Sequence, residues 1–175
     1  MTDIIKAMNP TAPVNTEAAA LAAARVSAVG IAIGAIHQAF NAWYATTPEA
    51  SAAAAASAAD LIEKLTGQVP SAEQLAASAQ QGMMVAGVLT LLQIGLAVWQ
   101  WLKPNIVLPI LFLVLCVWTF GTSALGLAPG GHQPMYLSLF SLFAMGIAIV
   151  THIAGIRGAS ALGKIRQQAE TAQDD

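Results

Sequence analysis

The sequence predicts an all-α fold, an integral membrane four-helix bundle with an extramembrane helical loop between its first two spans. Of its 175 residues, 57% are apolar and only 9% are charged, whereas soluble domains have about 25% charged residues. Four apolar stretches have the length of about twenty residues that a helix needs to cross a ~30 Å bilayer core. Asp, Glu, Lys and Arg are absent from all four stretches.

These stretches divide the chain into three segments. Residues 1–25 form an N-terminal segment, 26–156 the four-span membrane domain and 157–175 a tail. The predicted spans are Val26–Ala45, Gly82–Leu102, Ile106–Leu127 and Met135–Ile156. Residues 47–80 form the outer loop between the first two spans.

The first span has an alternative interpretation as a signal peptide that is cut near Ala39 or Ala45. The stretch before it is long, carries Asp3 and Glu17 as well as Lys6, and lacks the compact basic start of such peptides. The sequence therefore favours an uncleaved first helix.

The outer loop carries helix signals of its own. Thr47 is a capping residue before Pro48, which suits the first helical position, and Gly67 ends an alanine-rich stretch. Ser71, followed three residues later by Gln74, starts a second helix that continues into the second span. The loop is therefore predicted to be helical.

Proline residues lie on both sides of the third span and within it. Lys103 and Pro104 separate this span from the second, and Pro134 opens the fourth. Connections this short join antiparallel neighbours. Pro109 falls within the predicted third span, where a missing N–H and a bulky ring favour a kink.

The basic residues predict the orientation, because short cytoplasmic loops keep an excess of Lys and Arg. Those on one predicted side are Lys6, Arg25, Lys103, Arg157, Lys164 and Arg166. The remaining one, Lys64, lies in the acidic outer loop. The protein is therefore predicted to lie in the inner (cytoplasmic) membrane of the cell, with both termini facing the cytoplasm.

Each span carries a face of small and polar residues. Within lipid, small residues let helices approach closely and polar residues form hydrogen bonds between helices. The residues predicted to pack the helices and to form a polar interior are Gly30, Gly34, His37, Asn41, Gln93, Gln100, Thr119, Ser141 and His152. Gly30 and Gly34 form a GxxxG pair.

Two histidines lie within predicted spans. The favoured interpretation is structural hydrogen bonding, with Asn41 one turn from His37 and Gln93 across the bundle. The alternative is that His37 and His152 are axial ligands of a haem. Their predicted depths differ by roughly 10 Å at 1.5 Å per residue, so no cofactor is predicted.

No catalytic residue or metal site is predicted. The single cysteine, Cys116, lies in an apolar run, so one chain forms neither a disulfide framework nor a thiolate cluster. A carboxylate pair, a nucleophile beside a base and a phosphate-binding glycine loop are all missing from the sequence. The net charge of −2 and the absence of a basic patch argue against nucleic acid as a partner.

The sequence therefore predicts a non-enzymatic integral membrane protein that acts by helix association. It would serve as a subunit, assembly factor or scaffold of a membrane complex. The expected partners are the lipid bilayer and other membrane-protein subunits or further copies of the chain. The alternative is a bundle whose polar interior binds or conducts a small ligand such as haem, quinone or a solute.

Overall fold

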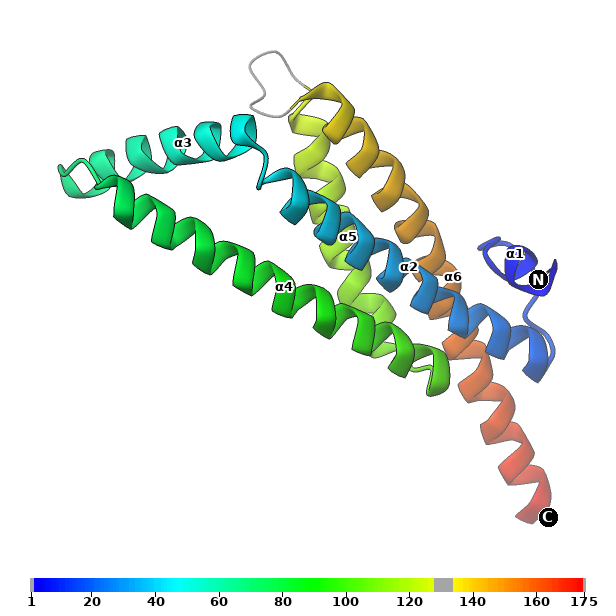
Figure 1. The fold of residues 1–175 in the computed structure, drawn as a ribbon. Coiled ribbons are helices and arrows are strands. Elements are labelled where there is room, and N and C mark those ends of the chain that lie inside the picture. Colours follow the sequence, from blue (N-terminus) through cyan, green and yellow to red (C-terminus); the bar gives the residue numbers. More distant parts are fainter. Residues whose placement is uncertain (1, 128–133, 175) are drawn as a thin grey trace. The chain divides into compact units, whose positions relative to one another are not determined.

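The computed structural model describes residues 2–127 and 134–174, and every regular element within them is an α-helix. The helices are α1 (Thr2–Ala7), α2 (Glu17–Tyr44), α3 (Pro48–Thr66), α4 (Ala72–Leu102), α5 (Val107–Leu125) and α6 (Met135–Asp174) (Figure 1). The predicted all-α class is confirmed. Part of the predicted connection between the last two spans, residues 128–133, lies outside the described residues.

Four of these helices are long and apolar enough to cross a membrane, as judged by length and composition. They are α2, α4, α5 and α6. The shortest of them, α5, has 19 residues and rises about 29 Å at 1.5 Å per residue, close to the ~30 Å of a bilayer core. The described part of the chain therefore contains four candidate apolar spans, as predicted.

The contacts within the chain define two compact units. The first unit consists of Met1–Gly34 and Gln93–Asp175, and the second is Ala35–Leu92. The helices α2 and α4 each contribute to both units, whereas α1, α5 and α6 belong to the first and α3 to the second.

The ends of α3 are those that the sequence predicts. The Thr47 hydroxyl accepts a hydrogen bond from the Ala50 N–H at 3.4 Å, and Pro48 is the first helical residue. Gly67 has φ +70°, a left-handed conformation that suits glycine, and its N–H donates to the Glu63 carbonyl at 2.8 Å. Both ends are therefore set by local hydrogen bonds.

The start of α4 has the predicted capping box. The Ser71 N–H donates to Gln74 Oε1 at 2.9 Å, and the Gln74 N–H donates to Ser71 Oγ at 3.2 Å. From there α4 continues for 31 residues without interruption. The position of residues 47–80 outside a membrane stays a prediction.

Pro109 does not lie in a helix interior. Because α5 begins at Val107, Pro109 is its third residue. The first N–H groups of a helix have no partner within it, so a proline there removes no helical hydrogen bond. The expected kink at Pro109 is therefore wrong, and α5 is one helix from Val107 to Leu125.

Two helices extend beyond the apolar stretches that predict them. The helix α2 starts well before Val26, after Thr16, whose hydroxyl accepts a hydrogen bond from the Ala19 N–H at 3.2 Å. The helix α6 continues far past Ile156 through a segment rich in good helix formers. The tail of the chain is therefore helical up to Asp174.

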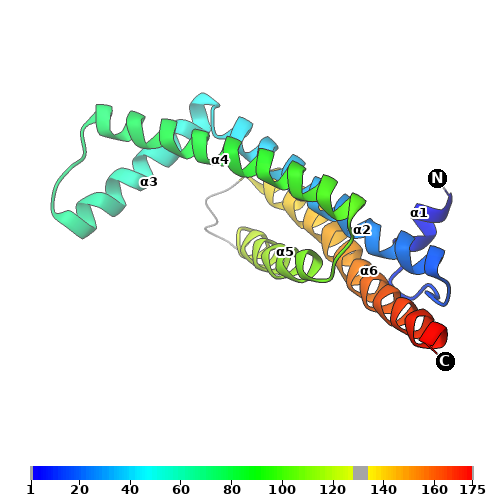
Figure 2. The same ribbon diagram turned by 90° about the horizontal axis from the view of Figure 1, so that it is seen from below.

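The short helix α1 packs against α2 and α6 within the first unit. With six residues it is too short to be stable alone, so apolar contacts hold it. Its cluster contains buried Ala7, Val26 and Ala154, with Ile4, Met8 and Ala22 at the edge. Both ribbon views show α1 beside the start of α2 (Figures 1 and 2).

The helix α5 has one buried and one exposed side. The buried residues are Pro109, Phe112, Cys116 and Ser123, at spacings of three, four and seven positions, which place them on one helix face. Cys116 packs with Ala144, Met145 and Ala148 of α6. The exposed side, named here the outer face of α5, consists of Leu111, Val114, Leu115 and Trp118. Contact between this apolar face and water would be energetically unfavourable.

Candidate functional site

Small residues bring α2 and α6 into close contact within the first unit. A Cβ added at Gly155 would lie 2.5 Å from the Ser27 Cβ. One added at Gly158 would lie 2.6 Å from the Ala23 carbonyl carbon and 2.7 Å from its Cβ. Since Cβ atoms essentially never approach other atoms within 3.0 Å, these positions accept only glycine at this helix separation.

The predicted GxxxG pair divides into a tight and an open position. A Cβ at Gly30 would contact the Thr151 hydroxyl and would lie 3.0 Å from Cε1 and Nε2 of His152. At Gly34 the nearest atom would be Gln93 Oε1, at an ordinary 3.8 Å. Of the two glycines, Gly30 therefore makes the close contact with α6.

These contacts form an antiparallel helix pair, because later residues of α2 meet earlier residues of α6. At one end the Arg166 Nε donates to the Glu17 carboxylate at 3.3 Å, and farther along Gly30 meets Thr151. We name this contact the α2–α6 seam. Its residues are Ala23, Ala24, Ser27 and Gly30 on α2, and Thr151, His152, Gly155 and Gly158 on α6.

Gln100 joins three segments of the first unit by hydrogen bonds. Its side chain is fully buried at 0% exposure, and Nε2 donates to the Ala24 carbonyl at 3.3 Å and the Asn105 carbonyl at 3.0 Å. Its Oε1 accepts from the Asn105 backbone N–H at 3.3 Å and from Nδ2 at 3.0 Å. The Asn105 Oδ1 in turn accepts from the Leu108 N–H at 2.9 Å, near the start of α5. The side-chain amide of Gln100 therefore has a structural role, because its hydrogen bonds connect α2, α4 and the turn before α5.

His152 lies fully buried in the α2–α6 seam, with 0% exposure. Its ring stacks on Phe112 of α5, with centroids 6.0 Å apart and planes at 23°. Among the residues that the structure describes, neither ring nitrogen has a hydrogen-bond partner. Buried polar atoms without partners are destabilising, so this imidazole is the unusual feature of the seam.

His37 belongs to the second unit, where it is buried. The Asn41 Nδ2 lies 3.1 Å from its Nε2 and 3.4 Å from its Nδ1, the neighbour that the sequence suggests. His152 lies in the first unit, so neither unit alone holds both candidate haem ligands. Haem ligation by His37 and His152 together therefore stays a hypothesis.

The other predicted site residues lie in the first unit. Ser141 on α6 is buried, whereas Thr119 on α5 and Gln93 on α4 are half-buried. Across residues 2–127 and 134–174, no group of three or more His, Cys, Asp and Glu side chains could hold a metal ion.

Sequence reasoning missed several residues that the structure brings together. Gly158 follows Gly155 by three positions and Thr151 precedes it by four, which is the spacing of a helix face. The row crosses the predicted end of the last span at Ile156, so Gly158 lies outside the apolar stretch. Asn105 gave no signal, since its pairing with Gln100 depends on the turn between α4 and α5.

Comparison of the chain with models of known protein families, with curated proteins and with solved structures finds no match. Three features of the first unit bear on function, namely the α2–α6 seam, the outer face of α5 and the long helix α6.

Proposed function

We propose that this chain is an integral membrane protein whose candidate spans form a four-helix bundle, and that it acts by helix association. It would be a subunit, assembly factor or scaffold of a complex in the inner membrane. The outer face of α5 carries this proposal. Trp118 is 73% exposed there, beside Leu111, Val114 and Leu115, and contiguous apolar patches on a protein surface mark contact with lipid or protein.

The α2–α6 seam supports the same proposal. Helices in lipid gain little from burying apolar surface, so they associate through close packing of small residues. The seam has this composition, with Gly30, Gly155 and Gly158 at the contact. Its antiparallel direction also supports a topology in which the start of α2 and the end of α6 lie on the same side of the membrane.

The helix α6 offers a second surface for partners. Its 40 residues rise about 60 Å, twice the thickness of a ~30 Å bilayer core. If Met135–Ile156 crosses the membrane, the remaining helix stands in the cytoplasm. There it would present exposed Lys164, together with the ion pair of Arg166 and Glu17, to an assembly partner.

The proposed topology predicts opposite accessibility of α3 and the end of α6. Single cysteines at Ser57 and Gln168, both exposed, are introduced in a Cys116→Ser background. In intact cells an impermeant maleimide should label the Ser57→Cys variant and spare the Gln168→Cys variant, because only the first faces outward. Permeabilised cells, in which both should react, are the control. Labelling at position 168 in intact cells would overturn the proposed orientation.

Helix association predicts a protein neighbour at the outer face of α5. A photoreactive benzoyl-phenylalanine replaces Trp118 on that face, and in a control variant it replaces Phe112, which is buried within the unit. Irradiated membranes should give one discrete protein adduct from position 118, with another copy or another subunit, and none from position 112. Adducts with lipid alone at position 118 would remove the support for association through α5.

The alternative proposal, binding of a small ligand in the polar interior, has one observation in its favour. His152 is buried with both ring nitrogens lacking partners among the described residues. An ionisable residue inside a membrane protein is a candidate functional group by default. Leucine substitutions at His152 and at His37 separate this proposal from a structural role.

A further inference from the structure

The imidazole of His152 is enclosed within the first unit by residues of α2 and α5. On the α2 side, a Cβ added at Gly30 would lie only 3.0 Å from Cε1 and Nε2 of the ring. On the α5 side, the ring stacks on Phe112 with centroids 6.0 Å apart. A protonated imidazole has two N–H donors. Because His152 has 0% exposure and its ring nitrogens lack partners among the described residues, neither donor would reach an acceptor or solvent.

No acidic side chain faces His152 from the two helices that contact it. The helix α5 contains no Asp, Glu, Lys, Arg or His, and its one titratable group, Cys116, packs against α6. The carboxylate of α2 belongs to Glu17, which pairs with Arg166. Arg166 follows His152 by fourteen residues, which is about 21 Å along α6 at 1.5 Å per residue. Glu17 is therefore too far away to neutralise a charge on this ring.

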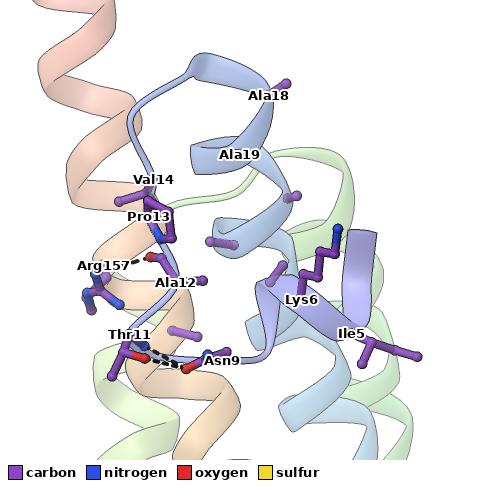
Figure 3. Close-up of a pocket in the computed structure, with 14 residues that line it drawn as sticks. Ile5, Lys6, Asn9, Thr11, Ala12, Pro13, Val14, Ala18, Ala19 and Arg157 are labelled. Atoms are coloured by element: carbon purple, nitrogen blue, oxygen red, sulfur yellow. Dashed lines mark hydrogen bonds between the residues drawn. The ribbon is translucent and has the colours of Figure 1, made fainter. Parts of the chain in front are cut away.

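The charged groups that lie nearer along both helices are positive. Arg25 of α2 donates from Nε to the Trp101 carbonyl at 3.0 Å. Arg157, five residues farther along α6, donates from Nη2 to the Ala12 carbonyl at 3.4 Å (Figure 3). The other histidine of α2, His37, belongs to the second unit. A positive imidazole in the seam would therefore lose its hydration and gain no counter-charge, which is energetically costly.

The α2–α6 seam is also too tight to solvate such a charge. The contacts at Gly155 and Gly158 bring α2 and α6 so close that even a methyl group does not fit between them. Side chains therefore have no room to rearrange around the ring while the helices stay in contact. Water reaches a protonated ring only when the two helices separate.

We propose that the α2–α6 seam is an acid-sensitive contact, which opens when His152 takes up a proton. The neutral ring packs between Gly30 and Phe112, whereas the protonated ring is stable only where both N–H groups meet water. Opening exposes the small-residue faces of α2 and α6. The inference goes beyond the proposed function, because it depends only on the packing of the first unit.

The first test follows thermal unfolding of the purified full chain in mild detergent from about pH 7.5 to about pH 4.5, on both sides of the ordinary imidazole pKa of about 6.5. The open state binds one more proton, so acid favours opening by about tenfold for each pH unit below about 6.5. The wild type should therefore lose stability as the pH falls, and His152→Leu should lack this part of the loss. Both chains keep the pair of Glu17 and Arg166, so the difference between their pH curves belongs to His152. The matched control His37→Leu keeps His152 and should keep its share of the acid effect.

The second test measures the separation of α2 and α6 directly. Spin labels are attached to cysteines at Ala18 and Gln168, exposed residues beside the pair of Glu17 and Arg166, in a Cys116→Ser background. Acid should lengthen the distance between the labels where His152 is present and leave it short in His152→Leu.

The labelled chain that keeps His152 decides the question even where His152→Leu fails to fold. An unchanged distance in acid, or the same acid loss of stability with and without His152, would overturn the proposal. Alkaline extraction of the membranes reports separately whether the chain is integral. A seam that ignores acid in an integral chain would therefore leave the proposed function standing.

Discussion

Gly158→Ala is expected to destabilise the first unit, although alanine is the better helix former. Its methyl group would lie 2.6 Å from the carbonyl carbon of Ala23, an atom of helix backbone that cannot rotate aside. Overpacking costs about 1–3 kcal/mol and sometimes more, which exceeds the gain in helix propensity of about 1 kcal/mol. The larger side chain of Gly158→Leu should prevent α2 and α6 from pairing.

Gly163 provides a matched control on the same helix, because no atom lies within 4 Å of a Cβ added there. Gly163→Ala gains only helix propensity and should raise stability by up to about 1 kcal/mol. Thermal unfolding of both purified variants in one mild detergent measures the difference. The expected shifts have opposite signs, and shifts of the same sign would contradict the α2–α6 seam.

Local signals in the sequence predict the helix ends around α3 well. The caps at Thr47 and Gly67 and the box of Ser71 with Gln74 depend on residues within one turn, so the sequence pattern is sufficient. The start of α2 and the end of α6 are different. Hydropathy detects only the apolar part of a helix, whereas both helices continue through polar, alanine-rich sequence that hydropathy does not register.

The candidate site depends more on tertiary structure. Gly30 and Gly34 are equivalent in the pattern, and which of them meets α6 depends on where the two helices cross. The same crossing brings Gly158 against Ala23, from segments that the sequence places outside the spans. The sequence shows which residues within the spans are polar, but it does not show which atoms they contact. Gln100 has partners on a turn and on α2, and His152 has none among the described residues.

The two histidines should respond in opposite ways to the same substitution. His152→Leu removes two buried nitrogen atoms that have no partner among the described residues. Such an unsatisfied group lowers the free energy of unfolding by about 1–3 kcal/mol. The substitution also loses the stacking on Phe112, worth about 0.5–1.5 kcal/mol, so a net gain of about 1 kcal/mol is expected. His37→Leu removes a side chain that contacts Asn41, and should lower stability by about 1 kcal/mol.

Thermal unfolding in mild detergent, together with a visible absorption spectrum of each purified variant, decides between structure and ligand binding. If His152 only packs within the seam, His152→Leu is at least as stable as the wild type and its spectrum is unchanged. If His152 holds a haem, a quinone or a solute, the substitution removes the stabilisation that the ligand gives to the folded state. A His152→Leu variant that is less stable than the wild type, or that loses a visible band, would therefore overturn the structural role and favour the small-ligand alternative.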